Sequence, residues 1–186
     1  MSVEGYALVA GRHAMTGLAA HVPTRPAAHS GPSPRPARTR PGPRAPERTL
    51  LLGPIITAPR CARAAVIETL TAWGIPHLTD DSTQITSELV ANAVTASTQG
   101  ASDGTEPAPI TLTLTISRTY GELCIRVWDP DPTPPPRAQQ ARDTWTERGR
   151  GLLIVAELSS RWGWYPGHTG KYVWSALPLS QPAPAA

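Results

Sequence analysis

The apolar residues after Pro59 recur every three or four positions, which is the spacing of one face of an α-helix. Gly74 and Pro76 are expected to end this first helix. A second helix is predicted to begin near Thr79 and Asp80, because acidic residues favour a helix N-terminus. The two apolar stripes are Ala62, Val66, Leu70 and Trp73, and then Ile85, Leu89, Ala93 and Ala96.

The helical period gives way to strict alternation after residue 109. Residues 110–117 and 122–129 alternate apolar and polar side chains, which predicts two strands joined by a turn at Tyr120-Gly121. A third helix over "GLLIVAELSSRW" and a last hairpin ending in "YVWSAL" follow. Between them lies the Pro-rich, charged segment "PDPTPPPRAQQARDTWTERGRG". A loop of that length inside a compact domain is either functional or a sign that the assignment is wrong.

The order of the predicted elements indicates the fold class. It is helix, helix, strand, strand, long loop, helix, strand, strand. Runs of this kind are typical of α+β proteins. We therefore predict a two-layer α/β sandwich, in which helices cover one face of a mixed, mainly antiparallel sheet.

The beginning of the chain has a different composition. Residues 22–59 are dense in Pro, Arg, Ala and Gly, and such a segment cannot bury enough apolar surface to offset its chain entropy. We predict a disordered Pro/Arg-rich arm over residues 1–48, a folded domain over residues 49–179 and a flexible tail over residues 180–186.

The positive charge of the protein belongs to this arm. Residues 1–48 hold seven Arg against two Glu, a net of +5, so the +3 of the whole chain leaves −2 for the remainder. A basic arm can contact nucleic acid or an anionic surface. A solvated tail is the simpler interpretation, so direct nucleic-acid binding is not expected. Whether translation starts at Met1 or at Met15 is left open.

Other features restrict the class of protein. No run approaches the roughly 18 apolar residues that cross a bilayer, and "YALVAGRHAM" is too short and interrupted for a secretory signal. Cys61 and Cys124 have neither a paired spacing nor a histidine cluster nearby, so neither a disulfide framework nor a zinc site is predicted. We expect a cytoplasmic protein without a membrane partner.

The second helix holds a polar pair beside its apolar stripe. In "SELVANAVTAS" Glu88 and Asn92 are four residues apart. Such residues project from the same face of a helix, so the two side chains can meet one ligand. The alternative is an ordinary solvated edge. Asp129, at the end of a predicted strand, is likewise either a site residue or a turn aspartate before Pro130.

Four blocks of sequence, taken together, point to a family. "ELVANAV", "IRVWDPDPTPP", "GRGLLIV" and "GKYVWSALP" resemble, in order and spacing, the histidine-kinase-like ATPase (GHKL or Bergerat) fold of bacterial anti-sigma regulatory serine/threonine kinases. The resemblance covers about residues 51–178. It implies a transcription regulator that binds ATP and Mg²⁺, phosphorylates a small anti-anti-sigma (STAS-type) partner and holds a sigma factor in exchange. A homodimer is compatible with it.

The resemblance also implies roles for the polar residues. Asn92 matches the family's metal-binding asparagine, whose side-chain oxygen suits Mg²⁺. Glu88 matches the catalytic carboxylate that orients or deprotonates the attacking hydroxyl. Asp129 matches the aspartate that accepts a hydrogen bond from the amino group of adenine.

Two glycine blocks complete the implied cofactor site. The block that lines the phosphates is matched by Gly149, Arg150, Gly151 and Leu152. Glycine there lets the backbone approach closely, and a helix N-terminus offers N–H groups to an anion. The long loop before this block would then be a nucleotide lid. Gly170 and Lys171 resemble the final block, with Lys171 either near the phosphates or capping an edge strand.

Departures from the family pattern leave an alternative open. Pro130, Asp131 and Pro132 stand where many relatives have glycine, and a rigid loop there would reshape the adenine pocket. Ala96 stands where many relatives have histidine. The alternative is a degenerate regulatory module that binds a partner, with or without nucleotide, and transfers no phosphate. A sensor histidine kinase is disfavoured, since no membrane span or preceding phosphoacceptor helix is visible.

Overall fold

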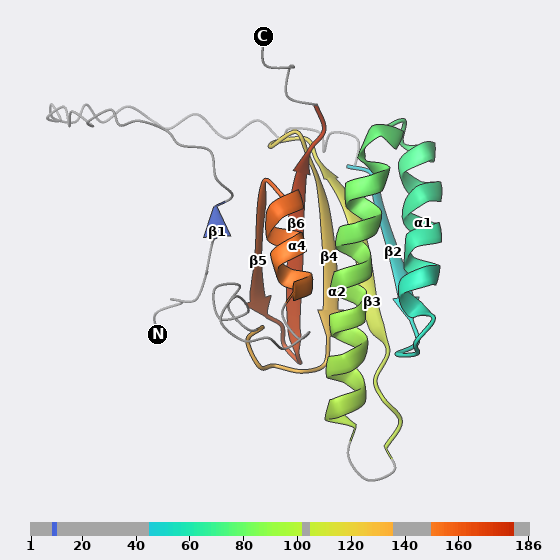
Figure 1. Ribbon diagram of the computed structural model, residues 1–186, viewed down its shortest axis with the longest axis vertical. Helices are drawn as coiled ribbons and strands as arrows, with labels where there is room; N and C mark the ends of the chain where they lie inside the picture. Colours follow the sequence, from blue (N-terminus) through green and yellow to red (C-terminus); the bar gives the residue numbers. More distant parts are fainter. Residues whose placement is uncertain (1–8, 11–44, 102–104, 136–149, 181–186) are drawn as a thin grey trace, which may run out of the picture. The chain divides into compact units, whose positions relative to one another are not determined.

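The computed structural model describes residues 9–10, 45–101, 105–135 and 150–180. These residues form a sheet of six strands and three α-helices (Figure 1). The strands are β1 (Val9–Ala10), β2 (Glu47–Leu52), β3 (Ile110–Ser117), β4 (Glu122–Asp129), β5 (Arg161–Pro166) and β6 (Lys171–Pro178). The helices are α1 (Ala58–Ala72), α2 (Thr79–Gly100) and α4 (Arg150–Leu158), with a single 3₁₀ turn, η1 (Pro76–Leu78), before α2.

The sheet has the strand order β1-β5-β6-β4-β3-β2, and each neighbouring pair is antiparallel. Figure 1 shows α1, α2 and α4 on the same face of this sheet. The predicted α+β sandwich is therefore confirmed. The sheet was expected to be mixed, but its described strands pair only in the antiparallel sense.

The hydrophobic core lies between the helices and the sheet. Because side chains alternate across a strand, every second residue of β3, β4 and β6 faces the helices. Leu112, Val127 and Val173 are register partners on these strands, and all three are buried. The predicted stripes of α1 and α2 are buried too, except that Trp73 and Ala96 are only half-buried.

β2 was not predicted from the sequence, and it corrects the boundary of the arm. Glu47 and Arg48, which we assigned to the arm, are the first two residues of β2 and pair with β3. Val9–Ala10, also within the range of the arm, forms β1 and pairs with β5. β2 contains three successive leucines and follows a Pro-rich segment, so it shows no alternation and is recognisable only by its pairing.

Several predictions fall on residues outside those that the structure describes. They are residues 1–8 and 11–44 of the arm, most of the lid loop (136–149) and the end of the tail (181–186). Disorder of the arm, closure of the lid and flexibility of the tail therefore stay predictions. In the described part of the chain, no helix combines the length and the apolar character needed to cross a membrane.

Candidate functional site

A cavity of about 380 Å³ lies between α2, the adjoining ends of β4 and β6, and the first turn of α4. Six residues singled out from the sequence line it: Glu88, Asn92, Asp129, Gly151, Leu152 and Lys171. Arg150 and Gly170 do not line it, although each precedes a lining residue in the chain. Gly149 lies outside the described residues.

The wall formed by α2 presents several polar side chains to the cavity, and Glu88 and Asn92 are the two that the sequence singles out. Glu88 is half-buried and Asn92 is exposed, and their spacing of four residues places them one turn apart on the same face. Neither makes a hydrogen bond or an ion pair with another residue in the described ranges. A carboxylate and an amide are therefore available to a ligand here.

The first turn of α4 packs against the Glu88 carboxylate. A Cβ atom added to Gly151 would overlap Oε2 of Glu88, so a residue without a side chain is needed for this carboxylate to keep its place. α4 begins at Arg150. The N–H groups of its first turn, which form the positive end of the helix dipole, are therefore close to the cavity.

At the opposite end of the cavity a buried lysine joins two aspartates. Lys171 Nζ donates to Asp129 Oδ1 at 2.9 Å, to Asp131 Oδ2 at 3.0 Å and to the Asp131 carbonyl oxygen at 2.9 Å. An ammonium group has three N–H donors, so all of them are used. The side chains of Lys171 and Asp129 are only 6% and 4% exposed. Lys171 thus has no donor left for a phosphate group.

The Asp129 carboxylate is held at a second point. Its Oδ1 atom also accepts the backbone N–H of Asp131 at 3.0 Å. Burial raises the pKa of Asp129, and the hydrogen bond and charge of Lys171 oppose this rise. Partial burial acts the same way on Asp131, but hydrogen bonds from Thr133 and Lys171 outweigh it and lower the pKa of Asp131.

Gly170 explains how Lys171 comes to lie opposite Asp129. Its φ of 77° lies in the left-handed region that favours glycine. A Cβ there would overlap the carbonyl oxygen of Asp129 and lie 2.8 Å from Cα of Pro130. Asp129 and Lys171 are the last register partners of β4 and β6. Gly170 therefore contacts the backbone that holds the site rather than the cavity itself.

Comparison with known proteins shows to which family the chain belongs. The family model described as the histidine kinase-like ATPase domain matches residues 57–174, well over half of the chain. This chain belongs to the histidine kinase-like ATPase family. Membership implies ATP binding, and it confirms the resemblance of the four sequence blocks to this family. All the residues of the site described above lie within the matched range.

Two solved structures share the fold of this histidine kinase-like ATPase. The RsbU and RsbW domains of Rv1364c from Mycobacterium tuberculosis match with 24% identity and a TM-score of 0.54, covering 74% of this chain and 34% of that one. The SiaB-SiaC complex from Pseudomonas aeruginosa matches with 15% identity and a TM-score of 0.50, covering 70% and 88%. This chain thus spans about a third of the Mycobacterium chain, and at these identities the likeness shows the fold alone. No curated protein matches this chain.

The residues present fit a Mg²⁺ ion bound together with a nucleotide. Mg²⁺ prefers oxygen ligands and usually keeps several waters beside one or two protein ligands and the phosphates. Asn92 offers one such oxygen at the edge of the cavity. Among the described residues, no group of three or more His, Cys, Asp and Glu side chains can hold a metal ion. Most ligands of the ion would therefore come from the phosphates and from water.

Asp131 is the site residue that sequence reasoning missed. We treated it only as part of a rigid loop after Asp129, whereas its carboxylate lines the cavity and pairs with Lys171. The signal in the sequence was two aspartates, two residues apart, at the end of a strand whose partner strand begins with lysine. Recognising it requires the register of β4 with β6.

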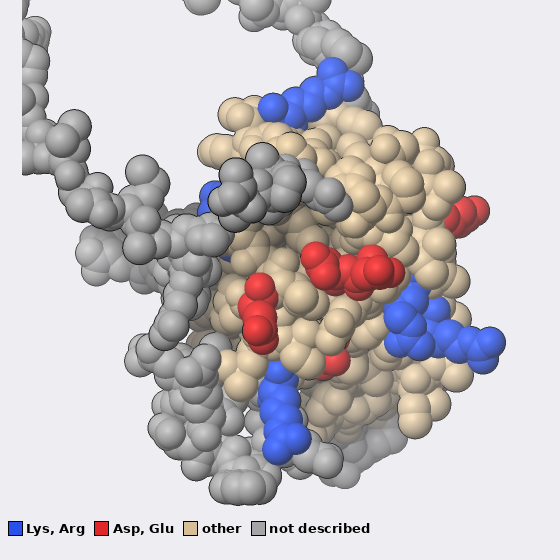
Figure 2. All heavy atoms as spheres, turned by 45° about the horizontal axis from the view of Figure 1, so that its top comes forward, with Lys and Arg blue, Asp and Glu red and all other residues tan. Residues whose placement is uncertain are grey.

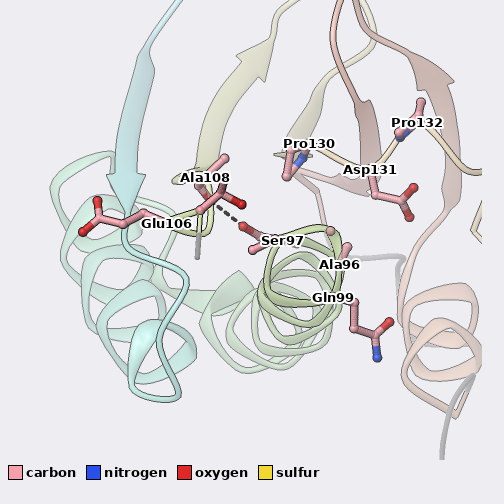
Figure 3. Close-up of a pocket in the computed structure, with 11 residues that line it drawn as sticks. Ala96, Ser97, Gln99, Glu106, Ala108, Pro130, Asp131 and Pro132 are labelled. Atoms are coloured by element: carbon pink, nitrogen blue, oxygen red, sulfur yellow. Dashed lines mark hydrogen bonds between the residues drawn. The ribbon is translucent and has the colours of Figure 1, made fainter. Parts of the chain in front are cut away.

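A second cavity of about 450 Å³ adjoins the first at the C-terminal end of α2. The two cavities share Ala96, Gln99 and Asp131. Figure 3 shows Pro130 and Pro132 across the space from α2, with the Ser97 hydroxyl turned toward Ala108, to whose carbonyl it donates at 2.6 Å. The Pro-Asp-Pro segment after β4 therefore forms a wall of the second cavity, and its Asp131 also lines the first.

Figure 2 shows charged side chains on one face of the described part of the molecule. Most acidic side chains lie near the middle of this face, and basic side chains lie around them. No continuous basic patch is visible on that surface.

Proposed function

We propose that this protein is an ATP- and Mg²⁺-dependent regulatory kinase of the anti-sigma type, which phosphorylates a serine or threonine of a small STAS-type partner and holds a sigma factor in exchange. One observation carries the proposal. The cavity brings Glu88, Asn92 and Asp129 together within a histidine kinase-like ATPase domain, with the first turn of α4 beside them. The likeness of the fold to structures that include an RsbW domain and a SiaB-SiaC complex supports it.

Each residue has a role that its surroundings permit. The buried Asp129 accepts a hydrogen bond from the amino group of adenine. The N–H groups at the start of α4 face the phosphates, and the Asn92 side-chain oxygen is a ligand for Mg²⁺, which neutralises phosphate charge when it is bound.

Glu88 accepts the proton of the attacking hydroxyl. The hydroxyl oxygen of the partner forms a bond to the γ-phosphorus, and the bond between that phosphorus and the β,γ-bridging oxygen breaks, so that ADP leaves. The proton lost by the hydroxyl moves to the Glu88 carboxylate, which has no partner in the described part of the protein. Positioning and charge do the rest, and no covalent intermediate on the enzyme is needed.

A binding module that transfers no phosphate is the second candidate. The observation in its favour is that the Asp129 carboxylate is already paired with Lys171, and that Pro130 and Pro132 stiffen the chain beside it. In this function the domain would capture a partner, with nucleotide as a regulator or without it.

Phosphate transfer decides between the two. Purified protein is incubated with labelled ATP, Mg²⁺ and candidate STAS-type partners. A kinase labels a partner, and Glu88→Gln lowers the rate by roughly 10²–10⁴-fold while ATP affinity is retained, because the amide keeps the size of the side chain but accepts no proton. Gln84→Glu, an exposed change on the same helix outside the cavity, is the control. ATP binding without labelled partner, and no effect of Glu88→Gln, supports the binding module.

A further inference from the structure

We propose that Lys171 and Asp131 are positioning residues, which aim the Asp129 carboxylate at the exocyclic amino group of the base and thereby set the preference of the site for adenine. The inference rests on the proposed function, in which Asp129 accepts that hydrogen bond. It assigns a new role to the ion pairs at the sheet end of the cavity.

One oxygen of the Asp129 carboxylate already accepts two hydrogen bonds within the protein. Oδ1 of Asp129 accepts from both Lys171 Nζ and the Asp131 N–H, at 2.9 and 3.0 Å. A carboxylate oxygen has two lone pairs, so this atom has no further acceptor site. A base must therefore be bound by Oδ2, and the direction of Oδ2 is set once Oδ1 is held at two points.

Lys171 is held as firmly as the carboxylate that it orients. Its three N–H donors are all used within the protein, two of them by Asp131. Gly170, with its left-handed φ and its close approach to the Asp129 backbone, places Lys171 directly opposite Asp129. The lysine therefore cannot turn toward a phosphate without breaking a buried, fully paired group, which is costly.

Among the described residues that line the cavity, Lys171 has the one cationic side chain. It alone of these residues can therefore form an ion pair with Asp129. Asp131 follows β4, Glu88 lies on α2, and α4 contributes the non-ionisable Gly151 and Leu152. Without Lys171, the charged side chains that line the cavity with the buried Asp129 would be carboxylates, and these favour the protonated form of Asp129. A protonated carboxyl group can rotate, and its O–H donates where adenine requires an acceptor.

A comparison of two nucleotides tests the inference. ATP has an amino group at position 6 of the base, whereas inosine triphosphate has a carbonyl oxygen there. Calorimetric titrations of wild type are expected to show ATP bound at least about tenfold more tightly, as a hydrogen bond to a charged acceptor provides. Lys171→Met should lose most of this ratio, with the affinity for inosine triphosphate little changed. If Lys171 only supports the fold, Lys171→Met should weaken the binding of both nucleotides by the same factor.

A second variant keeps the test valid if Lys171→Met does not fold. Asp131→Asn alters a side chain that is 32% exposed and leaves its backbone carbonyl contact with Lys171 in place. The ATP to inosine triphosphate ratio should fall by a smaller factor. Arg60→Met, an exposed change on α1 away from the cavity, should leave the ratio unchanged.

The outcomes separate this inference from the proposed function. If wild type binds neither nucleotide, the proposed function fails and the inference fails with it. If wild type prefers ATP but both variants keep the wild-type ratio of affinities for ATP and inosine triphosphate, only the inference is overturned. A gain in ATP affinity on Lys171→Met would also overturn it, because the lysine would then compete with the base.

Discussion

At the sheet end of the cavity Asp129, Asp131 and Lys171 are paired with one another, whereas at the helix end Glu88 and Asn92 have no partner in the described part of the chain. The sheet end is also the more buried, since Asp129 and Lys171 are almost inaccessible and Asn92 is exposed. One end of the site is thus complete in the protein alone. The other end offers polar groups that no described residue satisfies.

This difference has a physical consequence for mutations. Breaking a buried, fully paired group leaves an uncompensated charge, so it costs stability as well as binding. Removing an exposed, unpaired side chain costs little stability. Changes at the sheet end should therefore alter folding and base recognition, and changes at the helix end should alter metal binding and chemistry in a protein of normal stability.

The largest effect is expected at the turn that supports the sheet end. Gly170→Ala adds a Cβ in the left-handed region and against the backbone of Asp129 and Pro130, which should lower the free energy of unfolding by about 3 kcal/mol or more. Urea denaturation measures it. Gly74→Ala is the matched control, because Gly74 has a φ of 73° but a Cβ added there meets no atom within 4 Å. Equal stability of the two variants would contradict the close approach at Gly170.

The next effect concerns the contact of α4 with the helix end. Gly151→Ala should displace the Glu88 carboxylate and reduce phosphate transfer by about tenfold or more, since small misplacements of a reacting group are costly. Stability should stay within about 1 kcal/mol of wild type, because alanine favours a helix and the end of Glu88 can move. Single-turnover transfer and thermal unfolding are the measurements. Unchanged transfer would show that Glu88 does not need its observed place.

A smaller effect, on the binding of Mg-ATP, is expected from Asn92→Ala at the helix end of the cavity. Loss of the only assigned protein ligand should weaken binding of Mg-ATP by about tenfold, or about 1.4 kcal/mol, and should hardly change binding of metal-free adenosine. Calorimetry with both ligands measures this. Thr95→Ala is the control, since Thr95 also lines the cavity but its hydroxyl bonds to the Ala91 carbonyl oxygen. Equal losses of affinity for Mg-ATP and for metal-free adenosine would show that Asn92 is not a ligand of Mg²⁺.

The smallest effect is on the pH dependence of stability. Because the pKa of Asp129 is raised above 3.8 in the folded protein, the folded state holds this proton more tightly, and its contribution to stability falls as the pH rises from 3.8 through the raised pKa. Asp131, whose pKa is lowered, has the opposite sign and acts below 3.8.

Removal of Lys171 should widen the pH range over which the protonation of Asp129 changes the stability of the protein. In Lys171→Met the decline of the unfolding free energy above pH 3.8 should steepen, because the hydrogen bond and charge of Lys171 no longer oppose the rise in the pKa of Asp129. Urea denaturation across this range measures the slope. A slope as shallow as that of wild type would mean that Lys171 does not stabilise the charge of Asp129.

Local periodicity was enough to predict most elements and half of the site. The alternation in residues 110–117 and 122–129 predicts β3 and β4 with the bounds that the structure has. The spacing of Glu88 and Asn92 places both on one face of α2, because the pitch of a helix depends only on the chain itself. Each of these features is decided by residues within a turn or two of each other.

Tertiary structure alone decided the other half. Lys171 and Asp129 are 42 residues apart and meet because β4 and β6 pair in one register, which depends on side-chain packing and on the tight turn at Gly170. The contact between Gly151 and Glu88 depends on how α4 packs on α2. β2 has no alternating pattern of its own and exists as a strand through its pairing with β3. Contacts of this kind join distant segments, so no local period of the sequence can encode them.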